Sequence, residues 1–284
     1  MPLSDFVWSC LAIAGILYFG TCLCIYRWQR RLIFVPSKGL SETPSSYGLD
    51  YDEVWIREPP TGQDALHGWW LPVDGSCGVV LLLHGNSYTI GDNLSQAALF
   101  HRLGFSVLLA DYRGYGLSEG PFPNEQRVYA DAEAMWQYLT TRSGIAPESI
   151  LVYGHSLGGA IAIDLAARHP DIGALVIESS FTSMRDMASQ KPYLALFPTR
   201  LLLTQHFDSL RKVRSLAMPT LFIHGQSDGT VPYSMSQVLY QAAQDPKALL
   251  LSPNADHTDV ADTMGSDYDH GILSIARSLS HLAT

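Results

Sequence analysis

Cysteine is scarce in this sequence, and the few cysteines are poorly placed for cross-linking. Of its four cysteines, Cys10, Cys22 and Cys24 fall inside one apolar run, and Cys77 stands alone far from them. This distribution excludes a framework of disulfides, and no pair of cysteines stands with two histidines at the spacing of a zinc site. We therefore expect a protein that requires neither a metal nor a cofactor.

Positive charge is also sparse, with 18 Lys and Arg against 27 Asp and Glu and a net charge of -9. Nucleic-acid binding needs a cationic surface, and no basic stripe runs through the body of the chain, so a nucleic-acid partner is excluded. Apolar residues make up 47% of the sequence and charged residues 16%, which is ordinary for a folded protein. The 284 residues suffice for one large domain.

One long apolar segment stands near the N-terminus. The 21 residues from Phe6 to Tyr26 carry no charge, and as a helix they span roughly 30 Å, the thickness of a bilayer's hydrocarbon core. A cleavable signal peptide is the alternative. However, the residues before the run include Asp5 and no basic residue, and no small-x-small cleavage site follows the run. We predict a transmembrane anchor over residues 1–31, with its helix at about 6–26, and a linker over 32–50.

Basic residues gather directly after the apolar segment, at Arg27, Arg30, Arg31 and Lys38. The positive-inside rule places such a cluster on the cytoplasmic side of the membrane. The sequence therefore predicts a single-pass membrane protein whose folded domain lies in the cytoplasm.

Short β-rich runs alternate with longer helical patterns after residue 50, which predicts a mostly parallel sheet covered by helices on both faces. Tyr51–Arg57 and Ala65–Leu71, separated by a Pro-Pro-Thr-Gly turn at 59–62, are expected to form an antiparallel edge. The continuous apolar run Val79–Leu83 is typical of a buried central strand. Runs at 107–110, 150–153, 174–177, 220–223 and 248–251 bring the expected sheet to about eight strands.

Helical patterns include Glu125–Thr140 and Leu157–Arg168, and a longer irregular segment follows Glu178. The segment up to Pro219 shows weak strand character and is longer than the usual connection between secondary-structure elements. We therefore predict a short cap at about 181–215. Its aromatic and methionine residues fit either the lining of an acyl pocket or packing within the cap. These residues are Met184, Met187, Tyr193, Phe197 and Phe207.

A Gly-x-Ser-x-Gly motif, Gly154 to Gly158, stands between a predicted strand and a predicted helix. A turn this sharp needs glycines, because side chains there would collide with the neighbouring strand and helix, and it exposes Ser156 at the edge of the sheet. A serine hydroxyl becomes a nucleophile when a base takes its proton and a third group orients that base. The motif therefore predicts a nucleophilic serine with a histidine and an acid elsewhere.

The base and the acid are sought in later loops, since the order in such folds is serine, acid, histidine. His257 follows the last predicted strand, and Asp228 follows the strand before it. Glu178, after the strand at 174–177, is an alternative acid, whereas Asp256 is more typical of a residue that caps a loop.

Other polar residues near strand ends are interpreted as structural. His84 and His224 precede glycines at sharp turns and are expected to make local hydrogen bonds, and His155 is expected to point away from the serine. For Asp111 and Arg113 we favour a turn held by a buried ion pair and backbone hydrogen bonds over a functional role.

The sequence resembles the α/β-hydrolases of the Bem46 and ABHD13/ABHD17 type, which are grouped broadly with the S33 serine aminopeptidases. The resemblance extends from Leu32 to the C-terminus and implies an α/β-hydrolase fold over 51–284. The motifs that carry it are His84-Gly85-Asn86, Asp111 to Gly120, Gly154 to Gly159, Gly225 to Pro232 and Asp256-His257.

The resemblance also implies a role for individual residues. Ser156 is the expected nucleophile, Asp228 the orienting acid and His257 the base. The backbone N–H groups of Asn86 and Leu157 are expected to form an oxyanion hole.

The expected reaction is hydrolysis of an ester or thioester through an acyl-enzyme, with a small-molecule or lipid-like acyl substrate, because the anchor and cap place the pocket near lipid. Two alternatives stay open. An S33-like peptidase is one, although the cap shows no acidic cluster placed to receive a substrate's amino terminus. A membrane-tethered interaction protein without turnover is the other.

Overall fold

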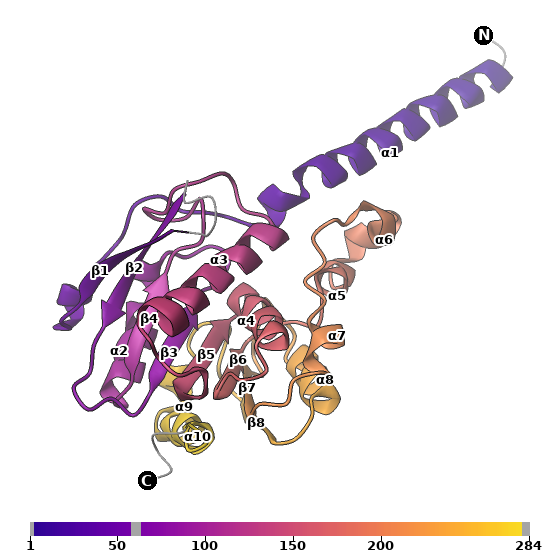
Figure 1. The fold of residues 1–284 in the computed structure, drawn as a ribbon. Helices are drawn as coiled ribbons and strands as arrows, with labels where there is room; N and C mark the ends of the chain where they lie inside the picture. Colours follow the sequence, from indigo (N-terminus) through magenta and orange to yellow (C-terminus); the bar gives the residue numbers. More distant parts are fainter. Residues whose placement is uncertain (1–2, 58–63, 280–284) are drawn as a thin grey trace.

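The computed structural model describes residues 3–57 and 64–279, in which eight strands form one sheet with helices on both faces (Figure 1). This confirms the α/β-hydrolase fold predicted from the sequence. The predicted turn at 59–62 lies outside the described residues. The strands are β1 (Asp52–Arg57), β2 (Ala65–Leu71), β3 (Val79–Leu83), β4 (Ser106–Ala110), β5 (Ile150–His155), β6 (Ala174–Glu178), β7 (Thr220–Gly225) and β8 (Lys247–Ser252).

The order of strands across the sheet is β1-β2-β4-β3-β5-β6-β7-β8. β1 pairs antiparallel with β2, and β2 pairs antiparallel with β4, which confirms the expected antiparallel edge. All other neighbours are parallel. The C-terminal ends of β3, β5, β6, β7 and β8 therefore open onto one edge of the sheet, where the polar loops of the chain follow.

Two apolar layers enclose the sheet, and strand pleating divides the side chains between them. Along β3, Leu81 and Leu83 join the first layer and Val80 and Leu82 join the second. Helices α3, α4, α7 and α8 cover the first face and α2, α9 and α10 the second. Their bounds are α2 (Leu94–Arg102), α3 (Glu125–Gln137), α4 (Leu157–Arg168), α7 (Ser209–Val213), α8 (Ser234–Ala242), α9 (Val260–Met264) and α10 (Ser266–Ala276).

Helix α3 ends three residues before the predicted Thr140, because the chain changes to a π-helical turn over Tyr138–Arg142. In this turn the Thr140 hydroxyl donates to the backbone carbonyl of Trp136, and Thr141 donates in the same way to Gln137. Such back-bonding from threonine competes with regular helical geometry.

Helix α1 (Leu3–Ile33) projects from the body of the protein as one long rod (Figure 1). It extends beyond the predicted 6–26 at both ends, and at its C-terminal end Gln29 and Ile33 are buried against the domain. Within the described residues it is the one helix that is long and apolar enough to cross a bilayer. Almost all of its other side chains are exposed.

The cap predicted at 181–215 consists of short helices and turns. It contains α5 (Met184–Ser189), a 3-10 turn at Pro192–Leu196 and α6 (Thr199–Leu202), and it leads into α7. Phe207 is buried at the base of the cap, where its ring packs near those of Phe34 and Tyr129. Packing within the fold is therefore the role of this aromatic residue.

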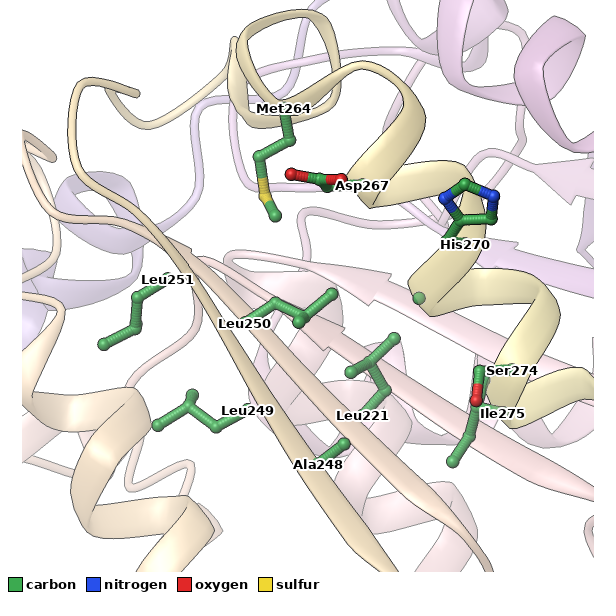
Figure 2. Close-up of a pocket in the computed structure, with 11 residues that line it drawn as sticks. Leu221, Ala248, Leu249, Leu250, Leu251, Met264, Asp267, His270, Ser274 and Ile275 are labelled. Atoms are coloured by element: carbon green, nitrogen blue, oxygen red, sulfur yellow. The ribbon is translucent and has the colours of Figure 1, made fainter.

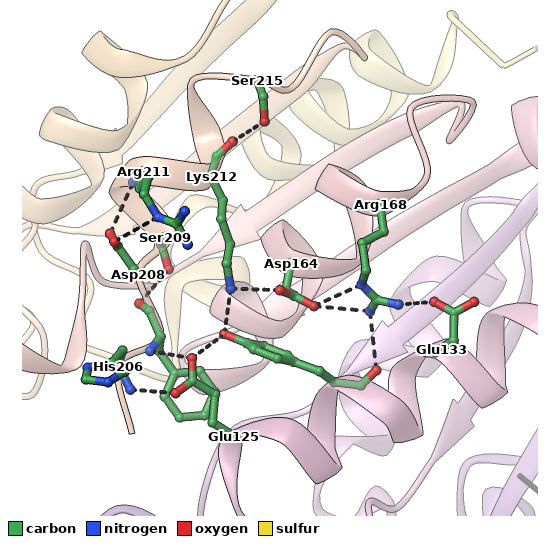
Figure 3. Close-up of polar contacts among 12 residues, drawn as sticks. Glu125, Glu133, Asp164, Arg168, His206, Asp208, Ser209, Arg211, Lys212 and Ser215 are labelled. Carbon is green, nitrogen blue, oxygen red and sulfur yellow. Dashed lines mark hydrogen bonds and ion pairs between the residues drawn. The ribbon is translucent and has the colours of Figure 1, made fainter. Parts of the chain in front are cut away.

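A polar network fastens the base of the cap to helices α3 and α4 (Figure 3). The Lys212 ammonium lies 2.7 Å from Oδ1 of Asp164 and donates to the Tyr129 hydroxyl over 3.0 Å. The Glu125 carboxylate accepts the backbone N–H groups of His206 and Phe207. These bonds fix the point from which the cap leaves the sheet.

Candidate active site

Ser156 occupies the turn between β5 and α4, with a strained backbone at φ 54° and ψ -116°. A Cβ on Gly154 would stand 2.3 Å from the carbonyl oxygen of Gly158, and one on Gly158 would stand 2.0 Å from that of Leu83. Glycine is therefore obligatory at both flanking positions. The predicted strand–turn–helix context of the motif is present, and strain of this kind is concentrated at functional sites.

Three predicted site residues come together in one chain of hydrogen bonds. The Ser156 Oγ lies 3.1 Å from Nε2 of His257, and Nδ1 of His257 lies 2.7 Å from Oδ2 of Asp228. An ionised carboxylate only accepts hydrogen bonds, so Nδ1 carries the proton and Nε2 accepts from the serine hydroxyl. The loops after β5, β7 and β8 supply these residues.

Asp228 has a second imidazole partner that the sequence did not indicate. His224 donates from Nε2 to Oδ2 of Asp228 over 3.0 Å, while its Nδ1 lies 2.6 Å from the Ser236 hydroxyl. Burial by itself raises the pKa of Asp228, but hydrogen bonds from His224, His257 and the Val231 backbone outweigh it and hold that pKa below its ordinary value. The carboxylate is thereby kept ionised beside His257.

The two alternative acids lie elsewhere. The Glu178 carboxylate is buried and accepts the Tyr268 hydroxyl over 2.5 Å, and its backbone carbonyl accepts the N–H of Ser156. Asp256 accepts the N–H groups of Gly229 and His257, as expected for a loop-capping residue. Of the three acids, only Asp228 contacts the His257 ring.

A small cavity of about 130 Å³ opens beside the serine. The loop after β3 forms one wall with Gly85 to Tyr88, and Thr230 and His257 form another. His155 also lines it. Its side chain is directed to the loop of His257, where Nε2 bonds the backbone carbonyl of that residue. None of the five cap residues singled out in the sequence contributes to the wall.

The two predicted oxyanion residues flank this cavity. Leu157 is the first residue of α4, and the first N–H groups of a helix have no partner within it. Asn86 lines the cavity, and among the described residues its backbone N–H makes no hydrogen bond. Its carbonyl accepts the Val35 N–H and the Tyr115 hydroxyl, and its side chain donates to the Ile33 carbonyl. This tie to the end of α1 was not anticipated from the sequence.

The remaining polar residues near the strand ends form a structural layer beneath the site. The Arg113 Nε lies 2.5 Å from Oδ1 of Asp131, the buried ion pair that was expected for this turn. Asp111 is fully buried, accepts the Ile90 N–H and lies 3.4 Å from Nε2 of His84. Burial raises the pKa of Asp111 to about 8 and lowers that of His84 to about 4.

A larger open cleft of about 530 Å³ lies away from these residues, between β8 and α10 (Figure 2). Leu249 and Leu250 form its apolar floor, and Asp267 and His270 stand on its helical side. The residues that line it include none of Ser156, Asp228 and His257, so size alone does not indicate the reactive site. Within 3–57 and 64–279, no three His, Cys, Asp or Glu side chains cluster as metal ligands.

Known proteins resemble this chain in both sequence and fold. The sequence profile of serine aminopeptidase, S33, matches residues 74–212. The chain is 38% identical over 252 residues to the uncharacterized protein Rv2307c of Mycobacterium tuberculosis, covering 88% of this chain and 87% of that protein. It is 30% identical over 277 residues to the α/β-hydrolase domain-containing protein WAV2 of Arabidopsis thaliana, covering 89% of each. The chain belongs to the S33-like α/β-hydrolase family.

Solved structures resemble this chain in fold. The Pyrococcus furiosus esterase Pf2001 superposes with a TM-score of 0.71 at 20% identity, over 87% of this chain and 98% of the esterase. An α/β-hydrolase from Vibrio vulnificus superposes with a TM-score of 0.68 at 21% identity, over 81% and 82% of the two chains. At these identities the likeness concerns the fold. Assignment to the Bem46 type within the family stays a prediction.

Proposed function

We propose that this α/β-hydrolase is a membrane-anchored serine hydrolase that cleaves an ester or thioester through an acyl-enzyme. The observation that carries the proposal is the continuous hydrogen-bond chain from Asp228 through His257 to Ser156. This arrangement suits removal of the serine proton. The ionised Asp228 holds the proton of His257 on Nδ1, so Nε2 is free to accept the proton of the serine hydroxyl.

The proposed reaction has two steps. In the first, Ser156 Oγ attacks the substrate carbonyl, His257 Nε2 takes the hydroxyl proton and passes it to the leaving alcohol or thiol, and an acyl-serine ester remains. In the second, His257 takes a proton from water as that water attacks the ester. The carboxylic acid leaves, and the proton returns to Ser156 Oγ.

The backbone N–H groups of Leu157 and Asn86 are the proposed donors to the oxyanion in both steps. Two features support this role: Leu157 stands at the start of α4, where the helix dipole favours negative charge, and Asn86 faces the same cavity. Donors already in place stabilise charge without reorganising during the reaction, and a single such donor is worth roughly a hundredfold in rate.

Ester cleavage is favoured over aminopeptidase activity by the chemistry of the cavity wall. An aminopeptidase must hold the substrate's ammonium group, which calls for a carboxylate near the serine. The described residues that line the cavity include no Asp or Glu. Failure of the pure protein to cleave aminoacyl substrates, with turnover of simple esters, would support this choice.

Membrane anchoring by α1 and a cytoplasmic α/β domain complete the proposal. The length and apolar character of α1 support the anchor, and the basic residues at its C-terminal end support the orientation. A reporter fused after Thr284 tests the orientation, since cytoplasmic activity of the reporter is the expected result.

Fluorophosphonate labelling tests the proposed catalysis directly. The full chain in detergent is the right material, because Gln29 and Ile33 of α1 are buried against the domain. Labelling is expected in the wild type, absent in Ser156→Ala, and strongly reduced in Asp228→Asn and His257→Ala. Ser227→Ala serves as a matched control, since Ser227 is exposed and lies outside the hydrogen-bond chain.

A folded wild type that fails to react with the probe would contradict an activated serine. The protein would then be better explained as a membrane-tethered interaction protein that keeps the fold without turnover. Full rescue of a loss-of-function phenotype by Ser156→Ala would point the same way.

A further inference from the structure

Outside α1, the most exposed large apolar side chains of the described residues gather at one place. Leu201 is 82% exposed, Leu196 is 73% exposed and Tyr193 is 63% exposed, whereas the next in order are Val35 at 51% and Trp55 at 46%. All three belong to residues 191–202, here named the cap tip. Exposed apolar groups that cluster in this way mark an interaction surface.

The cap tip is fixed alongside α1 at two levels. The Tyr18 hydroxyl donates to the carbonyl of Leu196 over 3.2 Å, and its ring stacks on Phe197 with centroids 5.6 Å apart. Further along α1, Gln29 is 2% exposed, and its side chain donates to the carbonyl of Leu202 and accepts the Thr204 N–H. The cap tip therefore runs in the same direction as α1, and Figure 1 shows α5 and α6 reaching toward that helix.

These contacts set the depth of the cap tip once α1 spans a bilayer, so the inference rests on the proposed anchor. Tyr18 precedes Tyr26, the last residue of the uncharged run, by eight residues. At 1.5 Å per residue, Tyr18 lies about 12 Å inside the hydrocarbon boundary. One leaflet of that core is about 15 Å thick. A group bonded to Tyr18 therefore lies within the near leaflet.

The charges around the cap tip suit a lipid surface. Arg185, Lys191 and Arg200 are exposed there, and Asp186, the one acidic residue between 184 and 203, is bonded to the Ser183 hydroxyl. Arg27 and Arg31 add exposed positive charge at the end of α1. Basic residues that surround an apolar patch favour the headgroups of anionic lipids, although the whole chain carries a charge of -9.

We propose that the cap tip inserts into the leaflet next to the α/β domain and forms a second membrane contact beside α1. The bilayer then covers Leu196 and Leu201, and the bonds of Tyr18 and Gln29 fix the orientation of the domain on the membrane. The partner is the lipid surface itself.

Fluorescence of environment-sensitive labels in vesicles tests the insertion. The full chain, with its four cysteines replaced by alanine, receives one cysteine at Leu196 or Leu201, carrying a nitrobenzoxadiazole label. Vesicles contain phosphatidylcholine and phosphatidylglycerol, with or without bromine on the acyl chains. Matched labels are placed at Leu11 in α1 and at Val238, an exposed apolar position on α8. Melting temperatures in detergent verify that each labelled chain is folded.

Bromolipids are expected to quench the labels at positions 196 and 201 at least twofold, as they quench the label at 11, and to leave the label at 238 unquenched. If the label at 11 is quenched but the labels at 196 and 201 stay unquenched like the one at 238, the proposed insertion is overturned and the anchor stands. Loss of quenching at 11 as well would overturn both. Neither result bears on Ser156, whose reactivity the fluorophosphonate probe reports separately.

Discussion

His155 Nε2 donates a hydrogen bond to the backbone carbonyl of His257 over 2.9 Å, and the centroids of the two imidazole rings lie 4.9 Å apart. The residue before the proposed nucleophile thus holds the backbone of the proposed base. Burial, followed by the neighbouring charge of His257, lowers the pKa of His155 to about 4. His155 is therefore neutral at pH 7, with its proton on Nε2, because a carbonyl only accepts.

Replacement of His155 tests this positioning role. His155→Phe removes the donor and is expected to lower kcat roughly tenfold, the equivalent of about 1.4 kcal/mol in transition-state energy, with KM little changed. His155→Gln keeps an amide donor and is expected to recover part of the rate. Steady-state kinetics on a p-nitrophenyl ester measure both variants, and equal activity of His155→Phe and wild type would contradict the role.

Asn86 links the loop after β3, which carries one proposed oxyanion donor, to the end of α1 through the bond from its side-chain amide to the Ile33 carbonyl. Asn86→Ala keeps the backbone N–H but removes this tie, so we expect kcat to fall roughly tenfold while KM stays similar. The control Asn93→Ala removes a comparable amide-to-carbonyl bond outside the cavity and should leave kcat unchanged. Similar kinetics for the two variants would show that the tie does not position the loop.

The cavity beside Ser156 favours short acyl groups, because about 130 Å³ is well below the 300 Å³ or more of drug-sized pockets. We expect kcat/KM to decline from p-nitrophenyl acetate and butyrate to the octanoate. Tyr88→Ala removes a large wall residue and should raise the octanoate-to-acetate ratio roughly tenfold, or by about 1.4 kcal/mol. A ratio unaffected by Tyr88→Ala would place the acyl chain elsewhere.

Asp111 is expected to make stability depend on pH. Its pKa of about 8 in the folded protein exceeds the ordinary value near 4, so between these pH values the folded protein keeps a proton that the unfolded chain has lost. Stability from this group therefore falls as the pH rises from 4 to 8. Asp111→Asn has no titrating group at this position and escapes this loss of stability. From pH 5 to pH 8 the free energy of unfolding of the variant, compared with that of the wild type at the same pH, should therefore rise by up to several kcal/mol. Urea titrations in detergent measure the free energies of unfolding of both proteins. Profiles of these energies against pH that run parallel for wild type and Asp111→Asn would refute the prediction.

Lys212 is expected to secure the base of the cap. Lys212→Met breaks its contacts with Asp164 and Tyr129, which are both largely buried, and should lower the free energy of unfolding by about 1–3 kcal/mol. The neighbouring Arg211→Met removes an exposed ion pair with Asp208 and should cost less than about 0.5 kcal/mol. Thermal unfolding in detergent compares the two. Equal effects would show that the network in Figure 3 does not stabilise the cap.

Local patterns were sufficient to predict most of the fold. The buried strand Val79–Leu83 and the helix Leu157–Arg168 have the predicted bounds, because an apolar run and a strand–glycine–helix junction are signals held within a few residues. The same locality explains why the sharp turn at Ser156 could be predicted, since that turn requires Gly154 and Gly158 on either side. The choice of Asp228 and His257 depended on the order of loops along the chain.

Other features depend on contacts between distant segments. His155 and His257 are 102 residues apart, and no pattern in the sequence predicts that the His155 ring bonds the His257 backbone. The second partner of Asp228, His224, became evident only when the loop after β7 was folded back onto its strand. For the five aromatic and methionine residues of the cap, the sequence left pocket lining and packing open. None of them lines the cavity beside Ser156, since the cap is bonded to α1 and to helices α3 and α4.

The sequence by itself determined the layered sheet, the serine on its sharp turn and the apolar N-terminal helix, because each follows from side-chain patterns and backbone sterics within short segments. Only the tertiary structure decided which acid faces His257, which histidines support that pair, and how the cap tip lies along α1. These depend on the directions in which loops return from separate strands, and packing of the whole chain sets those directions.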